Sequence, residues 1–185
     1  MKVLKFGGTS VATPESLTHV LDIVKGTNDR QLVVVSALGG TTNLLVAMAE
    51  QASSGVPHYK KHLATIETKH LNLIKHFVPV TQQSESISFL KSQLNELEEL
   101  LESLFTLNEL TTKSLSKISS YGEILSSTLI FNILKHQNCK VALKDARALL
   151  FTHTVNDREV VNHELSAEKT IDFINESKED ILLVP

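Results

Sequence analysis

The sequence has little of what several classes of protein depend on. Its 185 residues include one cysteine and no tryptophan, and 18 basic residues face 21 acidic ones. One cysteine, Cys139, cannot form an intramolecular disulfide or a thiolate metal cluster, so a reducing compartment is expected. A net charge of −3 and an aromatic content of 5% offer neither a basic field for a phosphate backbone nor a platform for stacked bases. We therefore expect no nucleic-acid partner.

Long apolar runs are also missing. No run approaches the roughly 18 residues that a membrane span needs, and the chain enters a predicted strand at residues 3–6 without the apolar region of a signal peptide. Apolar residues still make up 42% of the chain, which is enough for a buried core. These features predict a cytoplasmic domain without a membrane partner.

Two β–loop–α units open the chain. The first has its strand at residues 3–6 and a helix start at which Thr13 caps and Pro14 takes the first helical position. The second has an apolar, β-branched strand at residues 31–36, a glycine loop, and a helix beginning near Asn43. A strand so apolar requires cover on both faces, and two such units in succession predict an α/β fold with a parallel sheet.

The hydrophobic period changes to that of helices between about residues 57 and 137. Apolar positions recur at steps of three and four, as in the run from Ile87 to Leu104. We interpret this stretch as a helical insertion that packs on its own domain, because the run is too short to favour an intermolecular coiled coil.

The C-terminal part returns to the α/β pattern. A strand is predicted at residues 140–143, a helix at 166–177 and a buried strand at 181–184. An apolar strand at a terminus lacks the neighbours and the covering element that it needs. We therefore expect residues 1–185 to be the N-terminal portion of one larger domain, truncated at the C-terminus, with the last strand short of sheet partners.

The first loop is a candidate ligand site, because ligands in open α/β sheets lie beyond the carboxyl ends of the strands. Gly7 and Gly8 allow a phosphate to approach the backbone, and Lys5 is a candidate counter-charge. The nucleotide-binding motifs G-x-x-x-x-G-K-[ST] and G-x-G-x-x-G do not occur in the sequence. The alternative is a surface turn with a solvated lysine.

The second loop follows the same logic. Ser36 ends the strand, Gly39 and Gly40 loosen the turn, and Thr42 offers a hydroxyl at the start of a helix. The alternative for Thr42 is an ordinary N-cap, the usual role of threonine at this position.

A third signal lies in the helical region, where Gly122 and Glu123 interrupt an apolar pattern. Glycine inside a helix costs about 1 kcal/mol relative to alanine, so we expect a close backbone approach or a helix start here. Glu123 either faces solvent or pairs with a cation such as a substrate ammonium group.

Four segments together resemble the aspartokinases, which belong to the amino-acid kinase family. They are KFGGTSV at residues 5–11, SALGGTTNLL at 36–45, SYGE at 120–123 and DAR at 145–147, and they extend over essentially the whole chain. The resemblance implies a three-layer αβα amino-acid-kinase-like fold with a mainly parallel sheet. It also implies an enzyme that uses ATP and Mg²⁺ to phosphorylate the side-chain carboxylate of L-aspartate, the first step towards lysine, threonine and methionine.

The same resemblance implies roles for individual residues. The residues matching the nucleotide-binding positions are Lys5, Phe6, Gly7, Gly8 and Ser36, of which Lys5 is also the catalytic residue. Thr42 and Glu123 match the aspartate-binding positions, with Glu123 facing the substrate ammonium. Asp145 and Arg147 suit a structural ion pair as well as a catalytic role. No residue is assigned to a metal, because His58 and His62, spaced as a helical pair, lack a third ligand.

The chemistry agrees with this assignment. The side-chain carboxylate of aspartate, with a pKa of about 3.9, is ionised at neutral pH, so this nucleophile needs no general base. Phosphoryl transfer needs charge neutralisation and the alignment of two anions. The family's later segments, including its substrate-carboxylate arginine and adenine pocket, lie beyond residue 185, so the chain alone is expected to be inactive and the full-length parent to be a homo-oligomer. The alternatives are another carboxylate or carbamate kinase of the same family, or a catalytically dead phosphate-binding regulatory module.

Overall fold

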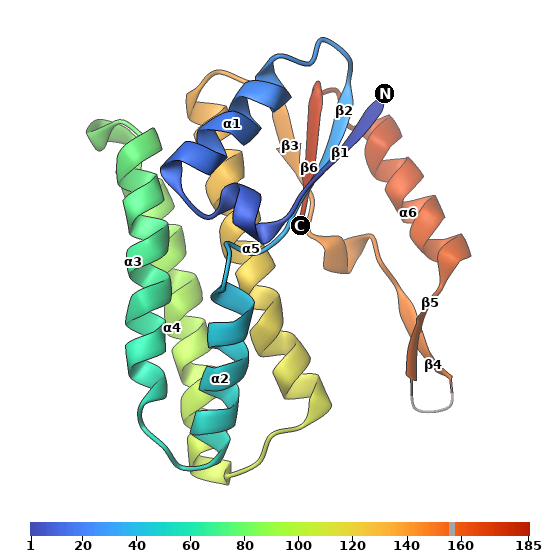
Figure 1. The fold of residues 1–185 in the computed structure, drawn as a ribbon. Helices are drawn as coiled ribbons and strands as arrows, with labels where there is room; N and C mark the ends of the chain where they lie inside the picture. The colour runs from blue at the N-terminus through green and yellow to red at the C-terminus, as the bar shows by residue number, and fades with distance from the viewer. Residues whose placement is uncertain (156–157) are drawn as a thin grey trace.

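A parallel sheet lies between two helical layers of unequal size (Figure 1). The structure, a computed structural model, describes residues 1–155 and 158–185. The sheet contains β1 (Lys2–Phe6), β2 (Gln31–Val35), β6 (Ile181–Val184) and β3 (Val141–Leu143), in that spatial order, and all neighbouring strands are parallel. The predicted α/β class, the αβα layers and the parallel sheet are thus confirmed.

The last strand lies inside the sheet. β6 pairs with β2 on one side and with β3 on the other, so that Leu183 stands between Val33 and Leu143. All four residues of β6 are buried. The expectation that this strand lacks sheet partners was therefore wrong. The chain crosses over through the helical region and places β3 at the far edge, which leaves a gap between β2 and β3 that β6 fills.

The larger helical layer consists of α2 (Thr41–Ser53), α3 (Tyr59–Phe77), α4 (Gln83–Leu107) and α5 (Thr112–His136). Of these, α5 covers one face of the sheet together with α1 (Pro14–Lys25), whereas α2, α3 and α4 pack on α5 and on one another. The stretch predicted to be helical holds α3, α4 and α5, and α2 packs against all three. Leu94, Leu97 and Leu101 of α4 are buried within this layer, so the leucine pattern serves the domain's own core.

Reciprocal side-chain caps set the start of α1 and of α5. Thr13 accepts a hydrogen bond from the backbone N–H of Ser16 at the start of α1, and Pro14 takes the first helical position as predicted. Thr111 and Ser114 form the same reciprocal arrangement at the start of α5. Both boundaries are therefore fixed by local sequence.

The second face of the sheet is covered by α6 (His163–Glu176) and by the buried side chain of Leu149. Phe173 of α6 packs with Leu182 and Val184 of β6. Leu32 and Val34 of β2 are only half-buried on this face. The predicted cover of β2 on both faces is complete on the side of the large layer and partial on the side of α6.

A β-hairpin separates η3 (Ala146–Ala148) from α6, and the sequence analysis did not predict it. It consists of β4 (Thr152–Val155) and β5 (Arg158–Val161), paired antiparallel. Two further short 3-10 turns are η1 (Gly8–Val11) and η2 (Val80–Gln82). Among the helices of residues 1–155 and 158–185, none has the length and apolarity needed to cross a membrane.

Candidate functional site

Two glycine loops meet at the carboxyl ends of β1 and β2. Phe6 stands beside Val35 in the strand register, so both loops leave the sheet at the same level. The N–H of Ser36 donates to the carbonyl of Phe6 over 3.1 Å, and the N–H of Gly39 donates to the carbonyl of Gly8 over 2.9 Å. The loops therefore form one connected surface at the edge where α/β proteins bind ligands.

Gly8 has no space for a side chain. A Cβ on Gly8 would lie 2.7 Å from the carbonyl oxygen of Ala37 and 3.3 Å from the Cα of Gly39. Both neighbours are backbone atoms, which cannot move without displacing the second loop. Glycine is thus required at this position by the contact between the loops.

Lys5 lies beside the first loop. Leu4 and Phe6 pack into the core, whereas Lys5 alternates to the other face of β1 and is exposed. Its side chain bends over Gly7, because a Cβ on Gly7 would lie 3.5 Å from Lys5 Nζ. Within the part of the chain that the structure describes, Lys5 forms no ion pair, so its ammonium stands free next to a glycine backbone.

Helix α5 packs directly on the second loop through Gly122. A Cβ on Gly122 would lie 2.8 Å from the Cβ of Ala37 and 3.3 Å from Leu45 Cδ1. Gly122 lies in the middle of α5, so of the two predicted explanations the close approach is confirmed and the helix start is wrong. The glycine allows the helix to approach the loop at the cost of helix propensity.

This close approach places Glu123 and Ser36 together. Glu123 is half-buried, and its Oε1 lies 3.5 Å from the backbone N–H nitrogen of Ala37. One turn further along α5, the hydroxyl of Ser126 donates to the carbonyl of Ser36 over 2.9 Å. The carboxylate of Glu123 is therefore held at the edge of the sheet and not in open solvent.

Thr42 lies in the first turn of α2 but is not its N-cap. The N-cap of α2 is Gly40, with a φ of +80°, and α2 begins at Thr41. Thr42 is the second helical residue and is exposed. The N-cap interpretation of Thr42 was wrong because a left-handed glycine already turns the chain into the helix. The hydroxyl of Thr42 is consequently not used for capping.

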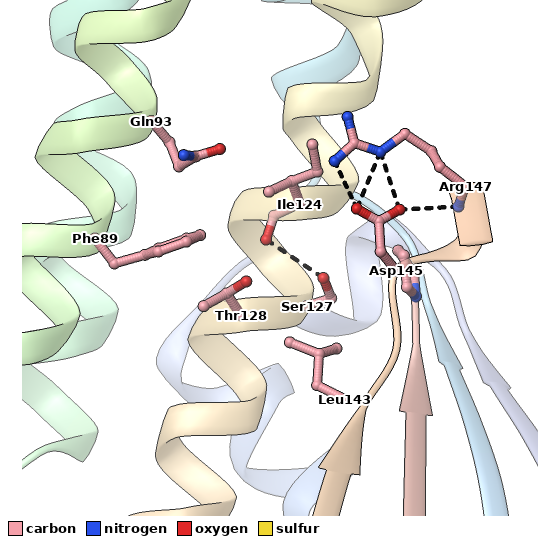
Figure 2. Close-up of a pocket in the computed structure, with 9 residues that line it drawn as sticks. Phe89, Gln93, Ile124, Ser127, Thr128, Leu143, Asp145 and Arg147 are labelled. Atoms are coloured by element: carbon pink, nitrogen blue, oxygen red, sulfur yellow. Dashed lines mark hydrogen bonds and ion pairs between the residues drawn. The ribbon is translucent and has the colours of Figure 1, made fainter. Parts of the chain in front are cut away.

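Asp145 and Arg147 form a two-pronged ion pair where the chain leaves β3 (Figure 2). Arg147 Nε donates to both carboxylate oxygens over 3.0 Å, and its backbone N–H donates to Asp145 Oδ1 over 2.8 Å. The hydrogen bonds from Arg147 hold the pKa of the Asp145 carboxyl below its usual range. Arg147 is exposed and Asp145 is half-buried, so the pair shapes this turn but contributes little to stability.

A cleft opens between α4, α5 and the end of β3 (Figure 2). Its volume is about 300 Å³, and Phe89, Gln93 and Thr128 line it beside the ion pair. An adjoining cavity of about 160 Å³ is lined by Glu123 together with Asp145 and Arg147. The structure thus brings Glu123 and the ion pair to one hollow, a proximity that the sequence analysis did not state.

The described ranges contain no group of three or more His, Cys, Asp or Glu side chains that could hold a metal ion. His62 instead lies with its Nε2 3.3 Å from Gln51 Nε2. Mg²⁺ usually takes several ligands from water and substrate phosphates. This part of the chain offers it no carboxylate cage of its own.

One residue next to the loops was missed by the sequence analysis. Lys69 of α3 donates from Nζ to the carbonyl of Gly39 over 3.1 Å. Nothing in the local sequence distinguishes Lys69 from the other lysines of α3, because the contact joins residues thirty positions apart.

The fold and the site define an α/β domain in which two glycine loops meet at the carboxyl ends of adjacent parallel strands. A model of the amino acid kinase family matches residues 1–179, and the chain belongs to that family. Family membership and the αβα fold agree with the resemblance seen in the sequence.

Several relatives are aspartokinases. The chain is 33% identical over 156 residues to Aspartokinase 1, chloroplastic, of Arabidopsis thaliana, a match that covers 82% of this chain and 26% of the relative. It is 32% identical over 161 residues to the lysine-sensitive aspartokinase 3 of Escherichia coli strain K12, covering 84% of this chain and 32% of the relative. The chain therefore spans about a third or less of the length of these relatives.

Solved structures give the same result. Escherichia coli aspartokinase III in complex with lysine and aspartate superposes with a TM-score of 0.86 at 25% identity, over 100% of this chain and 40% of that chain. The same enzyme in complex with aspartate and ADP gives a TM-score of 0.85 over the same shares. The chain corresponds to a part of these larger proteins.

Proposed function

We propose that this chain carries the phosphate loops and part of the aspartate site of an aspartate kinase. The reaction transfers the γ-phosphoryl group of ATP to the side-chain carboxylate of L-aspartate and gives 4-phospho-L-aspartate, the entry to lysine, threonine and methionine synthesis. The observation that carries the proposal is the connected pair of glycine loops, with Lys5 on one side and Glu123 on the other. The likeness to an aspartokinase solved with aspartate and ADP supports it.

The first loop is proposed to bind the phosphates of ATP. Lys5 bends over Gly7, so its ammonium lies next to the backbone of the first loop, where the two could bind an anion together. Phe6 and Ser36 are proposed to complete the nucleotide site from the ends of β1 and β2. Lys5 acts by neutralising negative charge that grows on the transferred group, which is what phosphoryl transfer requires of a protein.

The second loop and α5 are proposed to bind aspartate. Glu123 accepts a charge-assisted hydrogen bond from the substrate ammonium. Thr42 offers its exposed hydroxyl in the first turn of α2, where the helix dipole favours an anionic group. The substrate carboxylate is already ionised and attacks without a general base, so the absence of a nearby catalytic histidine in our assignment is consistent with the chemistry.

Magnesium enters this proposal as part of the substrate, MgATP. The described residues supply no cage for the ion, and phosphate oxygens are among its preferred ligands. No step in the proposal assigns the ion to a side chain of this chain.

Residues 1–185 are proposed to be the N-terminal portion of one kinase catalytic domain that acts in the cytoplasm as a homo-oligomer. The 185-residue chain by itself is proposed to be inactive, because positioning two anions requires groups on both sides of the site. A different carboxylate or carbamate kinase, and a phosphate-binding regulatory module without activity, remain the alternative functions.

Trapping of the acyl phosphate with hydroxylamine tests the proposal. The protein as its gene encodes it is incubated with MgATP and, in turn, L-aspartate, L-glutamate, acetate or carbamate. Hydroxamate formed from aspartate and not from the other carboxylates supports an aspartate kinase. Turnover of another acceptor would favour the first alternative, and phosphate binding without turnover of any acceptor would favour the second.

A further inference from the structure

Lys69 links the helical layer to both glycine loops. Its Nζ donates to the carbonyl of Gly39 over 3.1 Å, and the N–H of the same Gly39 donates to Gly8 over 2.9 Å. Gly39 is thus held from α3 on one side and from the first loop on the other. A single side chain of the helical layer therefore fixes the turn that leads into α2.

The turn held by Lys69 leads into α2 without a side-chain cap. Gly40 adopts a φ of +80° and provides no side chain to cap α2. A Cβ on Gly40 would lie 3.6 Å from Lys69 Nζ, so the ammonium stands directly against this residue. In the described structure, two backbone hydrogen bonds connect this turn to the start of α2. The N–H of Thr41 donates to the carbonyl of Leu38 over 2.9 Å, and the N–H of Leu44 donates to the carbonyl of Gly40 over 3.2 Å.

The charge of Lys69 is unusual for its place. A helix N-terminus carries partial positive charge, which favours an anion and disfavours a cation nearby. Lys69 is nevertheless half-buried beside the start of α2, and in the ranges that the structure describes it has no carboxylate within ion-pair distance. The hydroxyl of Thr41, fully buried there, also lacks a hydrogen-bond partner among those ranges. The region is therefore suited to an anionic ligand that compensates the charge of Lys69 and the partial charge at the start of α2.

We propose that Lys69 is a positioning residue for the amino-acid substrate. Lys69 holds the Gly39–Gly40 turn, so that the first turn of α2, which includes Thr42, presents its hydrogen-bond donors to a substrate carboxylate. The positive charge of Lys69 also helps to attract this anion. The inference rests on the proposed aspartate kinase function for its kinetic part. It does not require Lys69 to touch the substrate.

The first test is steady-state kinetics of the full-length protein. Wild type is compared with Lys69→Met, Lys69→Arg and the control Lys75→Met. Lys75 is an exposed residue of the same helix. Losing a charge-assisted hydrogen bond is expected to raise the KM for aspartate about tenfold in Lys69→Met, with the KM for ATP changed less than about twofold, since the first loop keeps its own bonds. Lys69→Arg, which still donates to a carbonyl, and Lys75→Met are expected to behave as wild type.

Hydrogen exchange of the free protein provides a second test that needs no activity. The amides of Gly39, Thr41 and Leu44 are hydrogen-bonded in and around the turn. They are expected to exchange about tenfold faster in Lys69→Met than in wild type or Lys75→Met, because their protection depends on local opening of the turn.

The outcomes separate the two proposals. If Lys69→Met matches Lys75→Met in both kinetics and exchange, or if it raises both KM values equally, the positioning role is overturned. If the wild-type protein phosphorylates no aspartate, the proposed function fails. In that event, exchange at Gly39, Thr41 and Leu44 still decides whether Lys69 holds the turn.

Discussion

Gly39 donates its backbone N–H to the carbonyl of Gly8, and this 2.9 Å bond joins the loops that follow β1 and β2. Gly8 has no room for a side chain at this contact, and Gly39 has little. A Cβ on Gly8 would lie 2.7 Å from the carbonyl oxygen of Ala37, and a Cβ on Gly39 would lie 3.2 Å from the carbonyl oxygen of Gly8. The two glycines therefore set how closely the proposed phosphate loop and the proposed aspartate loop approach one another.

Gly8→Ala is expected to separate the loops. The added methyl group meets backbone, so overpacking is expected to destabilise the protein by about 1–3 kcal/mol and to weaken ATP binding. Urea unfolding and titration with a fluorescent ATP analogue measure the two effects. Thr9→Ala, a change at the exposed next residue, serves as the control. Wild-type ATP affinity in Gly8→Ala would contradict the account of this contact.

Lys5→Ala is expected to abolish most of the activity and leave the fold intact. Lys5 is exposed and forms no ion pair in the described structure, so its loss removes charge neutralisation in the transition state without removing core contacts. A fall in kcat of about a hundredfold or more is expected, with an unchanged melting temperature. Lys2→Ala on the same strand, which breaks only an exposed ion pair with Asp29, is the control. Activity of Lys5→Ala within threefold of wild type would remove Lys5 from the catalytic role.

Glu123→Gln is expected to act on the amino-acid substrate. The neutral amide loses the charge-assisted bond to the ammonium group, so the KM for aspartate rises about tenfold or more while the KM for ATP stays close to wild type. Glu99→Gln, an exposed change on α4, controls for the loss of one negative charge. Equal effects on both substrates would assign Glu123 to the packing of the second loop instead.

Much of the fold follows from local patterns. The cap at Thr13, the leucine spacing of α4 and the two opening β–loop–α units occur close to where the sequence analysis predicts them. The place of β6 could not be predicted, because it depends on where a long crossover puts β3. A terminal apolar strand looks unpartnered in the sequence whichever strands flank it.

Of the features that the sequence analysis missed, some have a local signal in the sequence and others depend on contacts between distant segments. The hairpin of β4 and β5 has a local signal, since β-branched residues occur at 152, 154, 155, 160 and 161. The contact of Lys69 with Gly39 has none, because it joins distant segments. Thr42 was misplaced because a left-handed Gly40 starts α2 earlier than the hydroxyl residues suggest. The contact between the Glu123 carboxylate and the backbone N–H of Ala37 depends on the close packing of Gly122 against the second loop. Only the folded structure reveals this packing.

His70 is expected to make stability fall in mild acid. Burial within the helical layer lowers the pKa of His70 from 6.5 to about 4, while the unfolded chain keeps the ordinary value. The unfolded state therefore binds the proton first as the pH drops from 6.5 towards 4, which costs about 3 kcal/mol of stability by pH 4. Urea midpoints at pH 7.5, 5.5 and 4.5 are expected to fall less steeply in His70→Gln than in wild type.

The exposed His76 on the same helix provides the matched control for this pH dependence. His76→Gln is expected to follow the wild-type pH curve. If His70→Gln and wild type lose stability in parallel between pH 7.5 and 4.5, the buried imidazole does not control the response.

A crystal structure of the full-length protein with a non-hydrolysable ATP analogue and L-aspartate is the most direct test of the proposed site. We expect the terminal phosphates over Gly7 and Gly8 with Lys5 Nζ on their oxygens, and the aspartate ammonium within about 3 Å of the Glu123 carboxylate. We also expect the aspartate side-chain carboxylate to face the terminal phosphate. Phosphates bound away from the first loop, or aspartate bound without contact to Glu123, would contradict the proposed site.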